Sequence, residues 1–187
     1  RRRWVELHGF SGALGETLVL PDAEGGAAVA LVGWGDAEAR ARGRFHLAGA
    51  AEALPPGLYR LDTGLPAEET EEAALGWLLA SYRFERYRSA ERPPRRLVAP
   101  AGVNAARIET IARAVAYARD LVNTPANDLG PEALEASARA LAEEFSADCV
   151  LRVGEELLER NLPLIHAVGR AGAQAPRLID IRWGQRG

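Results

Sequence analysis

The histidines are the first residues of this sequence to consider for chemistry, because an imidazole can bind a metal ion or transfer a proton near neutral pH. The chain contains three of them, His8, His46 and His166. No two stand at the spacing that a helix or a hairpin gives to metal ligands. The sequence therefore favours ordinary surface or core histidines over a metal site.

The other side chains that could act as nucleophiles or acids and bases are also isolated. Cys149 lies in the apolar run DCVLRV, where a buried structural thiol is expected; as the single cysteine, it can form no internal disulfide, which fits a reducing compartment. Glu143 and Glu144 are neighbours on a predicted helix and are expected to be solvated. The serines lack the Gly-x-Ser-x-Gly context of a nucleophile elbow: Ser11, Ser81, Ser89, Ser137 and Ser146.

Two stretches could contact phosphate groups. Gly33 and Gly35 follow an apolar run, but two glycines fall short of a dinucleotide fingerprint, so a turn after a strand is favoured. Residues 82–96, YRFERYRSAERPPRR, combine arginines with aromatic rings and could contact nucleic acid. Glu85 and Glu91 dilute this charge. A solvated helix end with buried rings accounts for the same residues and is the favoured interpretation.

The composition is that of a globular protein. The chain has 187 residues, 48% of them hydrophobic, which is sufficient for a packed core. A formal charge of -3 and a pI near 5.7 give no general attraction to nucleic acid or to an anionic membrane. No apolar run reaches the roughly 20 residues that span a bilayer, and RRRWVELHGF does not resemble a signal peptide. We therefore predict a cytoplasmic protein.

The chain does not begin with methionine, and RRRWVELHGF resembles a helix end stopped by Gly9. The last residues stop just after a strand pattern. We expect the chain to be cut at both ends.

The spacing of apolar residues predicts strands that alternate with helices. Strands are expected in the runs 15–22, 27–35, 57–62, 95–100, 148–153 and 176–183. Helices are expected within 36–54 and over 66–88, 104–122, 131–145 and 154–161. This alternation indicates an α/β layer structure with helices packed on a twisted sheet.

Three of these helices have a predicted apolar face. In 66–88 the face is Leu75, Leu78, Leu79 and Tyr82; in the next helix Ile108, Ile111, Val115, Ala118 and Val122; in the third Leu134, Ala138, Leu141 and Phe145. Residues 66–88 also begin with glutamates and end with Arg83, Arg86 and Arg88, which would complement the helix dipole. Asn104 is the expected N-cap of the second helix.

A turn-rich joint, Arg119 to Pro131, separates the last two of these helices. Thr124 precedes a proline, so the helix before it should end near Val122. Asn123, Asn127 and Asp128 suit a bend, because their side chains bond nearby backbone groups and tolerate positive φ. Gly130 and Pro131, followed by a glutamate, predict a new helix start. The plain alternative is an ordinary loop between helices.

This joint and its surroundings resemble the leucyl (cytosol) aminopeptidase family of metallopeptidases. The resemblance rests on ARDLVNTPANDLGPEAL, the strand-like CVLRV and HAVGRAGAQAPRLIDIRW; it is strong over residues 105–183 and weaker over 75–88. Two departures are visible. Gly130 stands where the family usually has a threonine cap, and GRAGA at 169–173 replaces a Gly-x-Gly-Ser run.

The resemblance implies a fold and an activity. It implies a small macro-domain-like N-terminal domain with a mixed sheet flanked by helices, then a linker helix and the incomplete start of a second α/β domain. The domains would be 1–103, 104–130 and 131–187. The parent enzyme would be a homo-hexamer that removes N-terminal amino acids from peptides with two divalent metal ions, of the zinc or manganese type.

The family's catalytic residues are not carried over to this chain. Its metal ligands and catalytic groups include lysines within a Gly-Lys-Gly run that leads to Phe-Asp-Ser-Gly-Gly, and others in Asn-Thr-Asp-Ala-Glu-Gly-Arg. Neither run occurs here, and the chain contains no lysine at all. We therefore predict no catalytic, cofactor-binding or metal residue in this chain and expect it to be inactive alone. The alternative function is a non-enzymatic module, either a macro-like ligand-binding domain or an oligomer scaffold.

Overall fold

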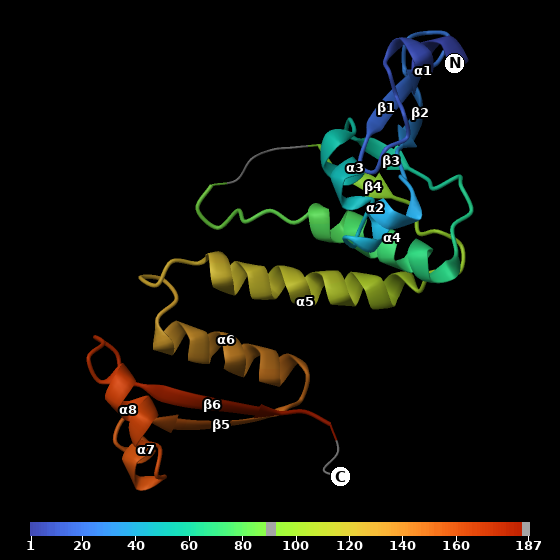
Figure 1. Cartoon of the computed structure of the whole chain (residues 1–187). Coiled ribbons are helices and arrows are strands. Elements are labelled where there is room, and N and C mark those ends of the chain that lie inside the picture. The colour runs from blue at the N-terminus through green and yellow to red at the C-terminus, as the bar shows by residue number, and fades with distance from the viewer. Residues whose placement is uncertain (89–92, 185–187) are drawn as a thin grey trace. The chain divides into compact units, whose positions relative to one another are not determined.

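The structure, a computed structural model, describes residues 1–88 and 93–184 and divides into two compact units, Arg1–Arg119 and Asp120–Gly187 (Figure 1). The elements of the first unit are α1 (Arg2–Leu7), β1 (Thr17–Pro21), β2 (Ala27–Val32), α2 (Ala37–Ala41), α3 (Ala48–Ala53), β3 (Gly57–Tyr59), α4 (Ala67–Ala80), β4 (Arg95–Leu97) and α5 (Ala105–Asn123), whose last turn falls in the second unit. The second unit continues with α6 (Pro131–Glu144), β5 (Asp148–Val153), α7 (Glu156–Glu159), α8 (Pro163–Gly169) and β6 (Arg177–Arg182).

The first two strands form an antiparallel hairpin, as the sequence predicts. Pairing runs from Thr17 opposite Val32 to Pro21 opposite Ala27. The turn is fixed by Asp22, whose Oδ1 accepts the backbone N–H groups of Glu24 at 2.9 Å and of Gly26 at 2.7 Å. Polar turn residues between two apolar runs thus determine this unit locally.

The expected single mixed sheet is not what the described residues of the first unit form. β3 and β4 pair in parallel over three residues each, as a second two-stranded sheet separate from the hairpin. The connection between them contains α4, which gives a β-α-β arrangement. Because each strand has only three residues, few ladder hydrogen bonds hold the pair together. The unit is a mixed α/β structure with small sheets.

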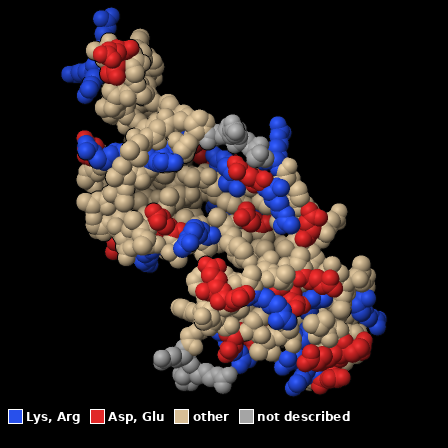
Figure 2. All heavy atoms as spheres, turned by 180° about the vertical axis from the view of Figure 1, so that it is seen from behind, with Lys and Arg blue, Asp and Glu red and all other residues tan. Residues whose placement is uncertain are grey.

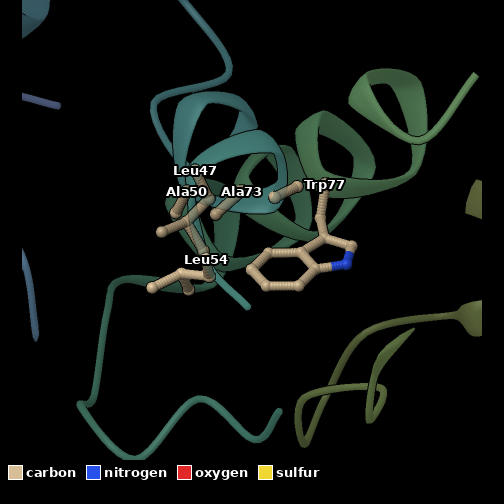
Figure 3. Close-up of a cluster of buried hydrophobic side chains, with 6 residues drawn as sticks. Leu47, Ala50, Leu54, Ala73 and Trp77 are labelled. Atoms are coloured by element: carbon tan, nitrogen blue, oxygen red, sulfur yellow. The ribbon is translucent and has the colours of Figure 1, made fainter. Parts of the chain in front are cut away.

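The core of the first unit lies between α3 and α4. Figure 3 shows side chains of the two helices pointing toward one another, with the Trp77 ring reaching toward Leu54. Trp77 is 3% exposed; its indole N–H donates to the Arg95 carbonyl at 3.1 Å, and its ring lies 5.4 Å from that of Tyr59. Through Trp77, α4 thus contacts both strands of the β3–β4 pair, and its main packing partner is α3.

The buried face of α4 differs from the predicted one. Its buried residues are Thr70, Ala73, Ala74, Gly76 and Trp77, whereas the predicted leucines are only half-buried. Small residues on this face allow α3 to approach closely, and the large indole fills the remaining space.

The helix predicted over 66–88 is also shorter than expected, because α4 ends at Ala80. Arg83 donates to the carbonyls of Ala80 at 2.8 Å and Tyr82 at 2.7 Å, and Arg119 donates to that of Leu79 at 2.7 Å. These bonds satisfy carbonyl groups that a helix end leaves free. The other predicted partners of the helix dipole, Arg86 and Arg88, lie beyond the helix.

The second unit is built on the antiparallel pair β5–β6, in which Asp148 lies opposite Arg182 and Val153 opposite Arg177. Its most buried side chains are Leu157, at 0% exposed, and Ala142, at 3%. The predicted apolar face of α6 is partly wrong, since Leu134 and Phe145 are 42% and 48% exposed. As in α4, an alanine takes the most buried position of the helix.

Helix α5 begins as predicted. The Asn104 Oδ1 accepts the Arg107 backbone N–H at 3.1 Å, which is the expected N-cap bond. Of its predicted apolar face, Ile108 is buried, but Ala118 and Val122 are exposed. Among the described residues, no helix combines the length and apolarity needed to cross a membrane.

Candidate functional site

The joint between α5 and α6 has the predicted helix–bend–helix form. α5 ends at Asn123, one residue before the Thr124–Pro125 bond. The Pro125 carbonyl then accepts the backbone N–H groups of Asp128 and Leu129, both at 2.9 Å, which closes the turn. None of the residues of the joint has a positive φ, so the bend does not depend on this conformation. Proline and a hydrogen-bonded turn are sufficient to make this bend.

Thr124 is the buried polar residue of the joint. It is 7% exposed, and its hydroxyl donates to the Asp120 carbonyl at 2.6 Å. The backbone N–H of Thr124 donates to the same carbonyl at 3.0 Å. The Asp120 carbonyl thus accepts two hydrogen bonds from one residue, the regular helical bond and one from the side chain. The threonine therefore terminates the helix without leaving a buried polar atom unpaired.

Helix α6 begins at Gly130 and Pro131 as predicted, but its cap comes from a distant residue. Gly130 has no side chain to accept a bond, and the Gln174 Oε1 accepts the backbone N–H of Glu132 at 3.0 Å instead. A Cβ atom at position 130 would stand 2.6 Å from that same oxygen. The glycine and the glutamine thus fit one another, and together they replace the threonine cap usual in the family.

The first residue of β6, Arg177, makes a second contact with α6. Arg177 forms ion pairs with Glu135 and, at 3.4 Å, with Glu132. The Arg177 side chain is only 9% exposed and that of Glu135 17%. Hydrogen bonds from Arg139 and then Arg177 hold the pKa of Glu135 below its usual value, although burial opposes them. Gln174 in the loop and Arg177 at the start of β6 therefore tie this part of the chain to the start of α6 at two points.

Each histidine contacts a different neighbouring residue. His8 stacks on Trp4, with ring centroids 4.4 Å apart, and its Nδ1 lies 2.8 Å from the Trp4 carbonyl oxygen. His46 lies edge-on to Trp34 at 5.6 Å. The His166 Nε2 lies 3.2 Å from the Glu155 carboxylate. Each has a local packing partner.

Three of the five serines have local hydrogen-bond partners. The Ser11 hydroxyl binds Glu16, and those of Ser81 and Ser137 donate to carbonyls of their own helices. Ser146 is exposed, and Ser89 lies outside the described residues. Cys149 is half-buried opposite Ile181 in the β5–β6 pair, and Glu143 and Glu144 are exposed on α6.

The backbone amides of the two glycines in GWG already donate hydrogen bonds to other backbone groups. The Gly33 N–H donates to Glu16 at 2.7 Å and the Gly35 N–H to Gly12 at 3.0 Å, so neither amide remains for a phosphate. A Cβ atom at Gly33 would lie 1.9 Å from the Ala13 carbonyl oxygen. These glycines permit close approach of two backbone segments.

The stretch 82–96 is described only in part, because residues 89–92, including Glu91, lie outside the described residues. Phe84 and Tyr87 pack edge to face at 5.8 Å, but Tyr87 is 54% exposed, so its ring is not buried as predicted. On the face that Figure 2 shows, arginine and acidic side chains are interspersed. That distribution does not favour a nucleic-acid surface.

A metal centre does not fit the residues that the structure describes. Within 1–88 and 93–184, no group of three or more His, Cys, Asp or Glu side chains could hold a metal ion. The chain also lacks lysine. We therefore assign no catalytic step of a metal-dependent reaction to these residues.

Sequence reasoning missed two arrangements. The Gln174 cap joins residues more than forty positions apart, and no local motif indicates it. A cavity of about 430 Å³ in the first unit brings Trp34, Arg40 and His46 together with carboxylates of α4. Its residues come from segments that no spacing rule connects.

Comparison with known proteins gives two family matches. Residues 1–100 match the family model described as M17 aminopeptidase, N-terminal domain. Residues 116–187 match that of the cytosol aminopeptidase family, catalytic domain. The probable cytosol aminopeptidase of Syntrophotalea carbinolica is 34% identical to this chain, over 96% of the chain and 41% of that relative.

Solved structures give the same result. The crystal structure of the cytosol aminopeptidase from Coxiella burnetii has a TM-score of 0.86 and 34% identity, covering 98% of this chain and 39% of that one. The bottromycin maturation enzyme BotP in complex with Mn has a TM-score of 0.77 and 34% identity, covering 95% and 41%. The chain thus spans about two fifths of the length of the relatives it matches. It belongs to the leucyl (cytosol) aminopeptidase family, M17, and carries that family's N-terminal domain together with part of its catalytic domain.

Proposed function

We propose that this chain is the N-terminal part of a two-metal aminopeptidase that releases N-terminal amino acids from peptides. Its relatives are named cytosol aminopeptidases, and the BotP structure contains Mn. The parent protein would be a cytoplasmic homo-hexamer with zinc or manganese. The observation that carries the proposal is the pair of family matches in the order expected for such an enzyme.

Within this chain we propose an accessory domain at 1–103, an interdomain helix and hinge at 104–130, and the start of the peptidase domain at 131–187. The hinge is supported by the proline turn after α5. The capped start of α6 supports the beginning of a new folding unit at 131. The chain would supply the structural entry to the peptidase domain, and the reacting groups would be supplied by the remainder of the parent enzyme.

The chain alone should be inactive, because it has no lysine and its described residues form no metal-binding group. The test is hydrolysis of leucine p-nitroanilide by the purified 187-residue chain with Zn²⁺ or Mn²⁺. The cytosol aminopeptidase of Coxiella burnetii serves as the positive control. No release of nitroaniline above the metal-only blank is expected. Metal-dependent turnover that copurifies with the chain would overturn the proposed inactivity.

A further inference from the structure

The first unit contains a cavity of about 430 Å³ whose two walls carry opposite charges. One wall is the segment 34–46, with Trp34, Arg40 and His46. The other is the start of α4, with Glu68 and Glu69. This volume lies in the range of small-molecule sites. The cavity therefore offers cationic, aromatic and anionic groups to one small ligand.

An ion pair between two lining residues, Arg44 and Glu72, joins the two walls of the cavity. Arg44 donates to the Glu72 carboxylate through Nε at 2.9 Å and Nη2 at 2.8 Å. The Phe45 backbone N–H donates to the other Glu72 oxygen at 3.1 Å, with Phe45 itself in the left-handed region at φ 59°. These two charged residues satisfy one another, so they shape the cavity and leave ligand binding to other groups.

The remaining charges have unused hydrogen-bonding capacity. Arg40 donates through Nη1 to the Gly35 carbonyl at 2.9 Å and, more weakly, to the Trp34 carbonyl at 3.4 Å. Its Nε and Nη2 donate to no partner within the described residues. Glu69 is half-buried, Glu68 is exposed, and neither accepts a hydrogen bond from the described part of the chain. A guanidinium and two carboxylates thus face one cavity with donors and acceptors to spare.

We propose that this cavity binds a free α-amino acid or a dipeptide as a zwitterion. The ammonium group would bind Glu68 and Glu69, the carboxylate would bind Arg40, and an apolar side chain would lie against Trp34 and the small residues of the walls. A simple anion would meet the carboxylates of Glu68 and Glu69, and the amides of Gly33 and Gly35 already donate to backbone carbonyls. The zwitterion is the ligand class that matches both walls.

This inference depends on the charges of the cavity and stands apart from the proposed aminopeptidase activity. Its test is isothermal titration calorimetry of the 187-residue chain with leucine and leucyl-leucine. Saturable binding at millimolar concentrations is expected. N-acetyl-leucine lacks the ammonium group and leucinamide lacks the carboxylate, so each should bind at least about tenfold more weakly, as loss of a charged hydrogen bond predicts.

Variants give a second readout. The double variant Glu68→Gln/Glu69→Gln should weaken leucine binding at least about tenfold, because it removes the charge opposite the ammonium group. Glu143→Gln/Glu144→Gln, a neighbouring pair exposed on α6, is the matched control and should bind leucine as the parent chain does. Circular dichroism checks that each variant is folded. The analogue series requires no variant and remains decisive if the double variant is unfolded.

Three results would overturn the proposal. The first is a folded chain that shows no saturable binding of leucine or leucyl-leucine. The second is equal affinity for leucine, N-acetyl-leucine and leucinamide. The third is competition for the same site by ADP-ribose with higher affinity, which would assign the cavity to a nucleotide-type ligand.

Discussion

At the scale of single residues, Gly130 and Gln174 form a cap that neither could form alone. The glycine leaves room for the glutamine amide, and the amide accepts the backbone N–H of Glu132 at 3.0 Å. A residue at a helix start with φ -76° and ψ 179° is also suited to provide its own side-chain cap. The same backbone therefore suits either cap, the Gln174 amide or a short polar side chain at position 130.

Replacing Gln174 by Ala should lower the free energy of unfolding by about 1 kcal/mol, the usual cost of a lost N-cap. Adding Gly130→Ser to that variant should restore most of the loss, because the serine hydroxyl can then accept the helix N–H. The measurement is urea-induced unfolding followed by circular dichroism. If Gly130→Ser is equally destabilising with and without Gln174, the two residues do not share the cap.

The carboxyl group of Glu72 links stability to pH. The Phe45 backbone N–H, and after it Arg44, hold the pKa of Glu72 below its ordinary value of 4.5. A depressed folded-state pKa stabilises the fold above the ordinary pKa, and this contribution is lost as pH falls through the lower folded value. Glu72→Gln should therefore reduce stability at neutral pH and flatten its decline below the ordinary pKa.

The check is the free energy of unfolding from urea titrations at several pH values between neutral and acidic. Because Glu16 and Glu135 also have lowered pKa values, only the difference between variant and parent chain is informative. Glu144→Gln, an exposed carboxyl group on α6, is the control. If the free energy of unfolding depends on pH in the same way for Glu72→Gln and for the parent chain, the ionisation of Glu72 does not contribute to that dependence.

At the scale of elements, the small residues of α4 determine how closely neighbouring segments approach. A Cβ atom at Gly76 would stand 2.8 Å from the Phe45 Cβ and 3.0 Å from its Cα. Gly49 on α3 has open space around it. The two glycines therefore provide matched helical positions, one crowded and one free.

Gly76→Ala should destabilise the chain by about 2 kcal/mol, because overpacking exceeds the gain in helix propensity. Gly49→Ala should instead be neutral or stabilising by up to about 1 kcal/mol. Thermal unfolding by calorimetry compares the two. A Gly76→Ala chain as stable as the Gly49→Ala chain would mean that the segment at Phe45 can move away without cost.

The elements also show what the sequence could predict. The hairpin and the joint were predictable, because Asp22 and the Thr124–Pro125 pair act on adjacent backbone. The end of α4 was not, since the residues after Ser81 are compatible with a helix, and one of the bonds at its end comes from Arg119, forty positions further along the chain. The cavity was not predictable either, because its walls, residues 34–46 and the start of α4, are joined by bonds from Arg44 and Phe45 to Glu72, which lies far along the chain.

Burial was predicted least well. Leucine spacing indicated the apolar faces of α4 and α6, but alanines occupy their most buried positions. Hydrophobicity scales rank leucine above alanine, whereas close packing of helices selects for small size. The family resemblance did not depend on these faces, and comparison with known proteins confirmed it.

At the scale of the whole molecule, the chain has two compact units with separate buried residues. Gly76 and Gln174 belong to different units and share no partner among the described residues. Changes at such sites usually add. We expect the effects of Gly76→Ala and Gln174→Ala on the free energy of unfolding to sum within about 0.5 kcal/mol in the double variant.

Urea unfolding of both single variants and of the double variant gives this coupling energy directly. Gly76→Ala combined with Gly49→Ala, within one unit, provides the comparison. A coupling clearly larger than about 0.5 kcal/mol between positions 76 and 174 would mean that the stabilities of the two units are linked.

The placement of the tryptophans offers an optical means of separating the two units. Trp183 is the single indole of the second unit and is 75% exposed, whereas Trp77 in the first is 3% exposed. Exposed indoles emit at longer wavelengths than buried ones. A chain with Trp183→Phe would fluoresce from the first unit alone, and subtracting its signal from that of the parent chain would report on the catalytic-domain segment by itself.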